Sequence, residues 1–126
     1  MSLPAVPTQL QNKKFLLIAN LKAAPGRAGE MKVHLFAIKA FAASSEPGTS
    51  LYRVTRGVGS DSDTFTVLEE YVPLFLDDFR LREMTSNKRR YADKTAFDLH
   101  GSSEVFKAFI SSGIIAEITV NFREEI

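Results

Sequence analysis

The order of strand-like and helical apolar patterns is the feature that most constrains the fold of this chain. Residues 13–23 form a nearly continuous apolar run, which predicts a central strand covered on both faces and ended by Pro25 and Gly26. Residues 27–45 repeat apolar positions at helical spacing, which predicts an amphipathic helix packed on a sheet. Its expected inward positions are Met31, Leu35, Ile38 and Ala42. The chain therefore begins with a strand and a helix that covers it.

Further strands and one more helix are predicted after this unit. Residues 51–56 alternate as a half-exposed strand does, and the short loop 57–63 predicts an antiparallel partner over 64–71. A second helix is expected over 92–110, with Asp93 as its N-cap. Its candidate inward positions are Ala96, Leu99, Phe106 and Ile110, and a kink is expected at Gly101 and the serines after it.

The last predicted strand covers 114–123 and completes the order β-α-β-β-α-β. Its alternation predicts one face that carries Ile114, Ala116, Ile118, Val120 and Phe122. This order is typical of the ferredoxin-like α+β fold, which has a single antiparallel sheet with both helices on one face. If the other face of the sheet carries Phe, Tyr and Ile, it needs a cover, so a homodimer that presses two such sheets together is expected.

Composition and length exclude several classes of protein. The 126 residues suit one domain over 13–126, preceded by a flexible arm over 1–12. The absence of Cys excludes disulfides, thiolate metal sites and a thiol nucleophile. With 16 Lys and Arg against 15 Asp and Glu there is no general attraction to nucleic acid, and the longest apolar run, 15–19, is too short for a membrane span. A cytoplasmic protein without nucleic-acid or membrane partners is expected. The ten Phe could form a pocket for a flat apolar ligand.

Four segments, in the order IANLKAAPG, EPGTSLYRV, FTVLEEY and ADKTAFDLHGSSEVFKAF, carry a resemblance to a known family. Together they resemble the antibiotic biosynthesis monooxygenase (ABM) family, whose members are ferredoxin-like units that pair into a dimeric α/β barrel. The resemblance implies oxygenation of an electron-rich aromatic or enol without metal or flavin, in a cavity between the sheet and the helices. It also marks 72–91 as an insertion, interpretable as a lid, as a contact for an anionic partner or as a surface excursion.

The candidate catalytic residues are His100, Tyr52 and Asn20. His100 stands at the helical His position of the family, and the resemblance implies a base or an anion-stabilising donor; the alternative is a His bonded to a backbone carbonyl. Tyr52 matches an aromatic position of the family. Asn20 is the least expected residue in an apolar strand, and its buried amide could meet a ligand oxygen.

The candidate substrate-binding residues, Glu69, Tyr71 and Phe65, share one face of the strand over 64–71. An inward carboxylate is costly unless it is paired, so Glu69 is either a proton acceptor with a raised pKa or a structural partner of Arg53 or Arg56. Tyr71 stands where the family has an aromatic that lines the pocket.

Three functions remain open from the sequence. The first is a cofactor-independent monooxygenase acting on a small hydroxylated aromatic or quinone-like molecule. The second is a small-molecule isomerase, and the third is a non-catalytic dimeric ligand-binding module on the same fold. No metal set or nucleotide loop is found, and the position of the heme-ligating His in a related branch is Ile110, which disfavours heme. Convergence of the candidate residues on one cavity would favour catalysis.

Overall fold

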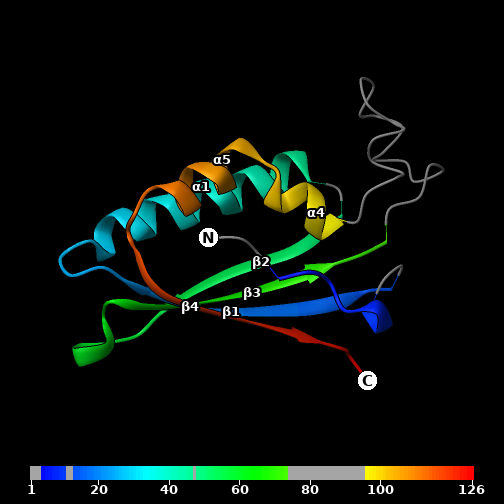
Figure 1. Ribbon diagram of the computed structural model, residues 1–126, viewed down its shortest axis with the longest axis horizontal. Helices are drawn as coiled ribbons and strands as arrows, with labels where there is room; N and C mark the ends of the chain where they lie inside the picture. Colours follow the sequence, from blue (N-terminus) through cyan, green and yellow to red (C-terminus); the bar gives the residue numbers. More distant parts are fainter. Residues whose placement is uncertain (1–3, 11–12, 47, 74–95) are drawn as a thin grey trace.

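In the computed structural model, residues 4–10, 13–46, 48–73 and 96–126 are described, and they form two layers (Figure 1). One layer is a four-stranded antiparallel sheet in the order β2-β3-β1-β4. Its strands are β1 Phe15–Ala23, β2 Thr49–Arg56, β3 Thr64–Tyr71 and β4 Ile115–Arg123. The predicted ferredoxin-like arrangement, with the first strand in the interior of the sheet, is confirmed.

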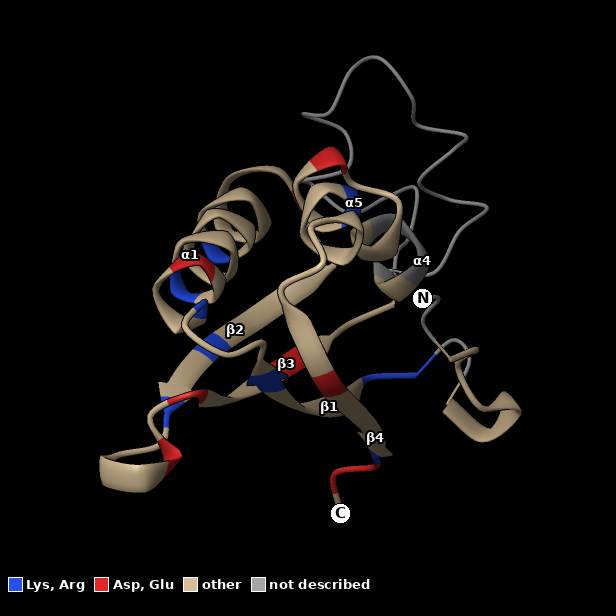
Figure 2. Ribbon diagram, turned by 60° about the vertical axis from the view of Figure 1, so that its left-hand side comes forward, with Lys and Arg blue, Asp and Glu red and all other residues tan. Residues whose placement is uncertain are grey.

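The second layer consists of helices on one side of the sheet (Figure 2). They are α1 Ala28–Ser45, α4 Ala96–Gly101 and α5 Glu104–Ser111, and short 3-10 turns cover Thr8–Leu10 and Gly59–Asp61. The prediction of a single helix over 92–110 is therefore wrong. The helix does not merely kink at Gly101 but ends there, and a second helix begins at Glu104. Ser103 caps this second helix, because its hydroxyl accepts a hydrogen bond from the Phe106 amide at 3.3 Å. The expected N-cap Asp93, most of 72–91 and the side chains of Ala96 and Leu99 lie outside the described residues.

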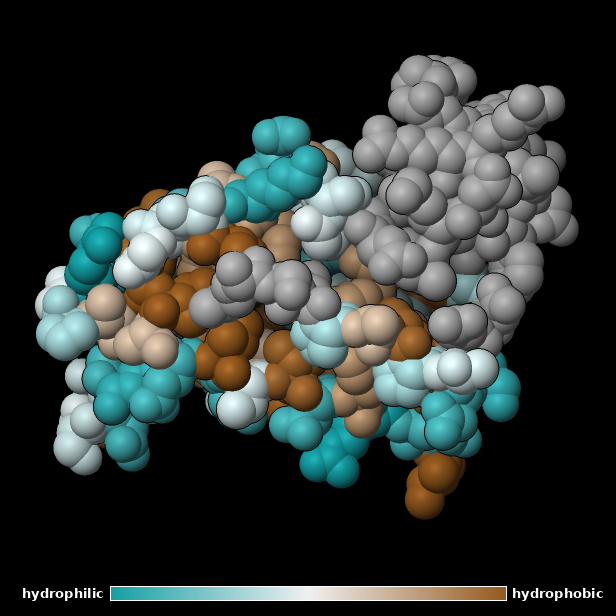
Figure 3. All heavy atoms as spheres, in the orientation of Figure 1, coloured by the Kyte–Doolittle hydropathy of each residue, from teal (hydrophilic) through white to brown (hydrophobic). Residues whose placement is uncertain are grey.

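The core lies between the two layers, and the predicted inward face of α1 is confirmed. Its four expected positions, Met31, Leu35, Ile38 and Ala42, are all buried. From the second predicted helix, Phe106 is buried and Ile110 is half-buried. Leu10 is also buried, and Val6 packs against the core, so this part of the N-terminal segment is attached to the domain. Along the helix–sheet junction beside β4, apolar side chains gather between more polar regions (Figure 3).

Within the described chain β1 is covered on one face only, whereas cover on both faces was expected. Burial alternates along the strand because every described helix packs on the same side of the sheet. The face away from the helices, called here the open face, carries half-buried Leu16, Ile18, Leu51 and Leu68 among threonines and charged residues. The expected Phe and Tyr are not part of it, because the alternation directs Phe15, Tyr52, Phe65, Tyr71 and Phe122 toward the helices.

β4 contains a bulge that the alternation did not predict. Ala23 pairs with Ile115 and Lys22 pairs with Glu117, so Ala116 has no partner across the ladder. Ala116 is consequently exposed, against expectation, while Ile118, Val120 and Phe122 pack against the core as predicted.

Candidate functional site

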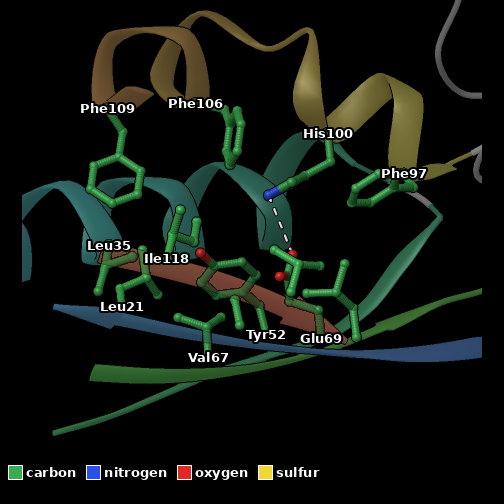
Figure 4. A pocket seen from close by; sticks show the side chains of 13 residues that line it. Leu21, Leu35, Tyr52, Val67, Glu69, Phe97, His100, Phe106, Phe109 and Ile118 are labelled. Atoms are coloured by element: carbon green, nitrogen blue, oxygen red, sulfur yellow. Dashed lines mark ion pairs between the residues drawn. The ribbon is translucent and has the colours of Figure 1, made fainter. Parts of the chain in front are cut away.

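His100 lies at the end of α4, and its side chain points down onto the sheet (Figure 4). Only 1% of the residue is exposed. The imidazole Nδ1 is 2.7 Å from Glu46 Oε1, and Nε2 is 3.4 Å from Glu69 Oε1. The buried ring is therefore placed between two buried carboxyl groups, and the alternative of a His held by a backbone carbonyl does not describe these ring contacts.

Glu46 is the functional candidate that the sequence analysis missed. It directly follows α1 in an extended conformation, and its Oε1 also accepts a hydrogen bond from the Thr49 hydroxyl at 3.0 Å. The available signal was that Glu46 is the first residue of EPGTSLYRV, one of the four segments that carry the family resemblance.

Glu69 has partners other than the arginine that was expected. The Tyr71 hydroxyl donates a hydrogen bond to Glu69 Oε1, and both residues are buried. The Arg interpretation is wrong because Arg53 is exposed and pairs along β3 with Leu68 of the open face. Arg56 instead donates from Nε to the Ser62 carbonyl at 2.6 Å.

A cavity of about 30 Å³ lies beside His100 and Glu69. This is room for one or two water molecules. It is walled by apolar and aromatic side chains from both layers: Leu17, Ala19, Leu21, Leu35, Tyr52, Val67, Glu69, Phe97, His100, Phe106, Phe109, Ile118 and Val120. A small number of polar groups in an apolar cavity is typical of a ligand site.

Two polar groups of this cavity lack hydrogen-bond partners in the described part of the chain. His100 Nε2 is buried without one, since its approach to Glu69 does not have hydrogen-bond geometry. The Tyr52 hydroxyl has no described partner either, and its ring centroid is 5.7 Å from that of His100. Since buried polar groups are normally satisfied, the buried His100 Nε2 is available to a ligand oxygen or a water molecule, and the unpaired Tyr52 hydroxyl offers a second contact.

Three of the six predicted site residues, His100, Tyr52 and Glu69, line the cavity together. Tyr71 lies behind Glu69, and Phe65 is buried on the same face without lining the cavity. Asn20 is on the opposite face of the sheet, so its prediction as a pocket group is wrong. Its neighbours Ala19 and Leu21 point into the core, and period-two alternation therefore directs Asn20 to the open face, where it accepts a 2.8 Å hydrogen bond from Thr66.

Burial and mutual charge shift the protonation of this group of residues. Burial alone lowers the pKa of His100, but the hydrogen bond to Glu46 and the charges of Glu69 and Glu46 outweigh it, so the pKa is raised. Burial raises the pKa of Glu69, and His100 and Tyr71 offset this only in part. Burial, with Glu69 nearby, also raises the pKa values of Tyr52 and Tyr71 well above the usual range. The site thus binds protons more tightly than the separate residues would.

This proton affinity predicts how stability depends on pH. A raised pKa means that folding takes up protons, so the stabilisation is complete at low pH and is lost as pH rises. The stabilisation from His100 is complete below about pH 6.5, which is the pKa of a His in the unfolded chain. It is lost as pH rises through the higher pKa that His100 has in the folded protein. We expect the melting temperature to fall across this range, and His100→Gln to flatten the fall. The control His34→Gln, on α1, should keep the wild-type slope; a flat wild-type profile above pH 6.5 would contradict the prediction.

The fold of this chain is shared by solved structures of other proteins. No protein-family model and no curated protein matches the chain. Solved structures match over nearly the whole chain, and their common fold is the ferredoxin-like α+β unit described above.

Three of the matching structures bear the printed name "putative antibiotic biosynthesis monooxygenase". The one from Caulobacter crescentus is 19% identical, with TM-score 0.64 over 91% of this chain and 92% of that chain. The one from Bacteroides thetaiotaomicron is 15% identical, with TM-score 0.66 over 90% of each chain. The one from Nitrosomonas europaea is 12% identical, with TM-score 0.65 over 92% and 93%. The chain therefore has the fold of the ABM family, as the resemblance implied.

Neither a membrane-spanning helix nor a metal-binding cluster occurs among the described residues. No helix among them combines the length and apolar character needed to cross a bilayer. No group of three or more His, Asp or Glu side chains in this part of the chain is arranged to hold a metal ion.

Proposed function

We propose that this protein is a cofactor-independent monooxygenase that oxidises a small hydroxylated aromatic or quinol with molecular oxygen. The observation that carries the proposal is the buried His100 Nε2, which faces an apolar cavity without a hydrogen-bond partner in the described structure. Glu46 engages the other ring nitrogen, so that Nδ1–H donates to the carboxylate and Nε2 is free to exchange a proton with a ligand.

In the proposed reaction, His100 Nε2 accepts the proton of the substrate hydroxyl. The Glu46 carboxylate stabilises the imidazolium that forms, and the phenolate lies beside it as an ion pair. The electron-rich ring transfers one electron to O₂ and combines with the superoxide formed. His100 returns its proton to the peroxide, and loss of one water molecule leaves a new carbonyl on the ring. One O₂ is consumed and one oxygen atom enters the product.

The neutral imidazole of His100 is the form that accepts the proton, so the reaction rate depends on pH. Because the carboxyl groups raise the pKa of His100, the basic form accumulates only above its usual range. A base of raised pKa is also a stronger proton acceptor. The proposal therefore implies that the rate increases with pH as His100 loses its proton.

Oxygen uptake by the purified protein tests the proposed activity. Hydroquinones, naphthols and anthrones are supplied without added metal or cofactor, and uptake is compared with the uncatalysed rate of each compound. Uptake above that rate supports the monooxygenase, and product mass should show one added oxygen and two hydrogens lost. Uptake equal to the uncatalysed rate for the whole panel would contradict it.

The small volume of the cavity favours a second candidate, an isomerase that moves a proton within a small carbonyl compound. About 30 Å³ is well below the several hundred Å³ usual for drug-sized ligands, so a compact substrate needs less rearrangement than a bicyclic ring. The same His100 would act, without O₂. Deuterium exchange into small hydroxyketones under nitrogen, with no oxygen uptake on any aromatic, would select this function.

We further propose that the protein is a homodimer formed through the open face of the sheet. Half-buried Leu16, Ile18, Leu51 and Leu68 give this face apolar area that a second copy would cover. Light scattering should then give about twice the 14.0 kDa mass of one chain. Leu68→Arg is expected to yield monomers, while the control Val58→Arg, at a residue 85% exposed in the 57–63 loop, should remain dimeric. A monomeric wild-type mass would exclude this assembly.

A further inference from the structure

A second hollow lies next to the catalytic cavity and shares one wall with it. We call it the α1–β2 groove; its volume is about 110 Å³, and it is lined by Lys39, Ala42, Ala43, Thr49, Ser50, Leu51 and Tyr52. Among the described residues, Tyr52 alone lines both hollows. Its hydroxyl has no described hydrogen-bond partner that would hold the ring in place. Displacement of this ring would join the cavity and the groove into a single elongated site.

The two ends of that elongated site differ in charge. At the inner end, His100 is accompanied by the buried carboxyl groups of Glu46 and Glu69, and neither Lys nor Arg is among the described residues that line the cavity. At the outer end, Lys39 is the only Lys or Arg among the described residues that line either hollow. Transfer of a hydroxyl proton to His100 leaves the net charge of the inner end unchanged. A carboxylate placed there would lie beside Glu46 and Glu69, and burial of a further negative charge next to these carboxyl groups is unfavourable.

We propose that the ligand site continues past Tyr52 into the α1–β2 groove, where Lys39 pairs with a negatively charged substituent remote from the hydroxyl that His100 engages. The preferred ligand is then a hydroxylated aromatic with an acidic group at its far end. A ligand with the acidic group next to the hydroxyl is rejected, because that group would lie beside Glu46 and Glu69. The role of His100 in this inference rests on the proposed function, but the pairing with Lys39 concerns binding only.

Binding without oxygen separates this inference from the proposed reaction. The probes are 2-naphthol, 6-hydroxy-2-naphthoate with its carboxylate remote from the hydroxyl, and 3-hydroxy-2-naphthoate with the two groups adjacent. Naphthol fluorescence reports binding directly, since the chain has no Trp. Anaerobic titration of the wild type should show the remote isomer binding about fivefold more tightly than 2-naphthol, the magnitude of one partly exposed ion pair. The adjacent isomer should bind more weakly than 2-naphthol.

Variants of α1 lysines identify the residue responsible. Lys39→Met should remove the fivefold preference and Lys39→Arg should keep it, whereas the control Lys32→Met should leave it unchanged because Lys32 lies over Phe36 and does not line the groove. Tyr52→Ala should accelerate association of 2-naphthol about tenfold by opening the shared wall.

The outcomes distinguish the inference from the function. Equal binding of 2-naphthol and the remote isomer, a preference that survives in Lys39→Met, or no binding of the remote isomer overturns the inference, whatever the oxygen uptake. A Lys39-dependent preference without oxygen uptake on any compound sustains the inference and removes the monooxygenase proposal.

Discussion

His100→Gln should lower the oxygen-uptake rate on a naphthol or anthrone substrate by about 100-fold or more. Proton transfer by a positioned side chain contributes about 10²–10⁴-fold, and a glutamine amide cannot accept the hydroxyl proton. Gln has nearly the length of His and can donate to Glu46, so the buried carboxyl group keeps a partner. Initial rates at saturating substrate, measured between pH 6 and 9, provide the test.

Two controls make the His100 result interpretable. His34→Gln removes the other histidine of the chain, which lies on α1 with its ring 5.6 Å from that of Phe109, and it should retain the wild-type rate. Circular dichroism and the mass in solution should match the wild type for both variants. If a folded His100→Gln protein keeps at least half of the wild-type rate, His100 is not the proton acceptor.

Glu46→Ala is expected to reduce the free energy of unfolding by about 3 kcal/mol. Removal of one partner of a buried pair leaves the other group buried without compensation, and such changes cost about 3–5 kcal/mol. Here His100 Nδ1 and the Thr49 hydroxyl would both lose their acceptor. For a domain of this size the loss corresponds to a decrease of about 10 °C in melting temperature. Chemical denaturation followed by circular dichroism measures it.

The matched control is Glu30→Ala, which removes an exposed carboxylate of α1, the helix that Glu46 directly follows. Glu30 pairs with Arg27 on the surface, and exposed pairs contribute about 0–1 kcal/mol. Glu30→Ala should therefore change stability by a small fraction of the Glu46→Ala effect. Equal losses in the two variants would show that the buried contacts of Glu46 add no net stability.

Only some residues of the buried His100 site could be predicted from the sequence. Glu69 and Tyr71 were found because alternation along one strand shows which residues share a face. The arginine partner predicted for Glu69 was wrong, because the choice between an arginine and His100 depends on how α4 lies over the sheet. Asn20 was misplaced for a related reason: the nearly continuous apolar run suggested two covered faces, whereas every described helix packs on one face.

The fold itself was largely predictable because its signals are local. Helical spacing identified the inward residues of α1. Gly113 follows the end of α5 with a φ of +77°, which suits a residue without a side chain. Only a kink was predicted where α4 and α5 are separate, and the bulge at Ala116 was not predicted. Both depend on contacts with other elements: the Ser103 cap determines where α5 begins, and pairing with β1 decides which β4 residue is left out.

Local periodicity is enough to predict the order of elements, the face that α1 turns to the core and the strand face shared by Glu69 and Tyr71, because each follows from a period of two or 3.6 residues. The packing of the helices on the sheet, in contrast, brings Glu46 to the ring of His100, 54 residues away, and makes Tyr52 line both the cavity and the α1–β2 groove. Such contacts join residues from different elements, and they form only when helices and sheet pack into one core that excludes water. That exclusion also gives the His100 site its altered proton affinity.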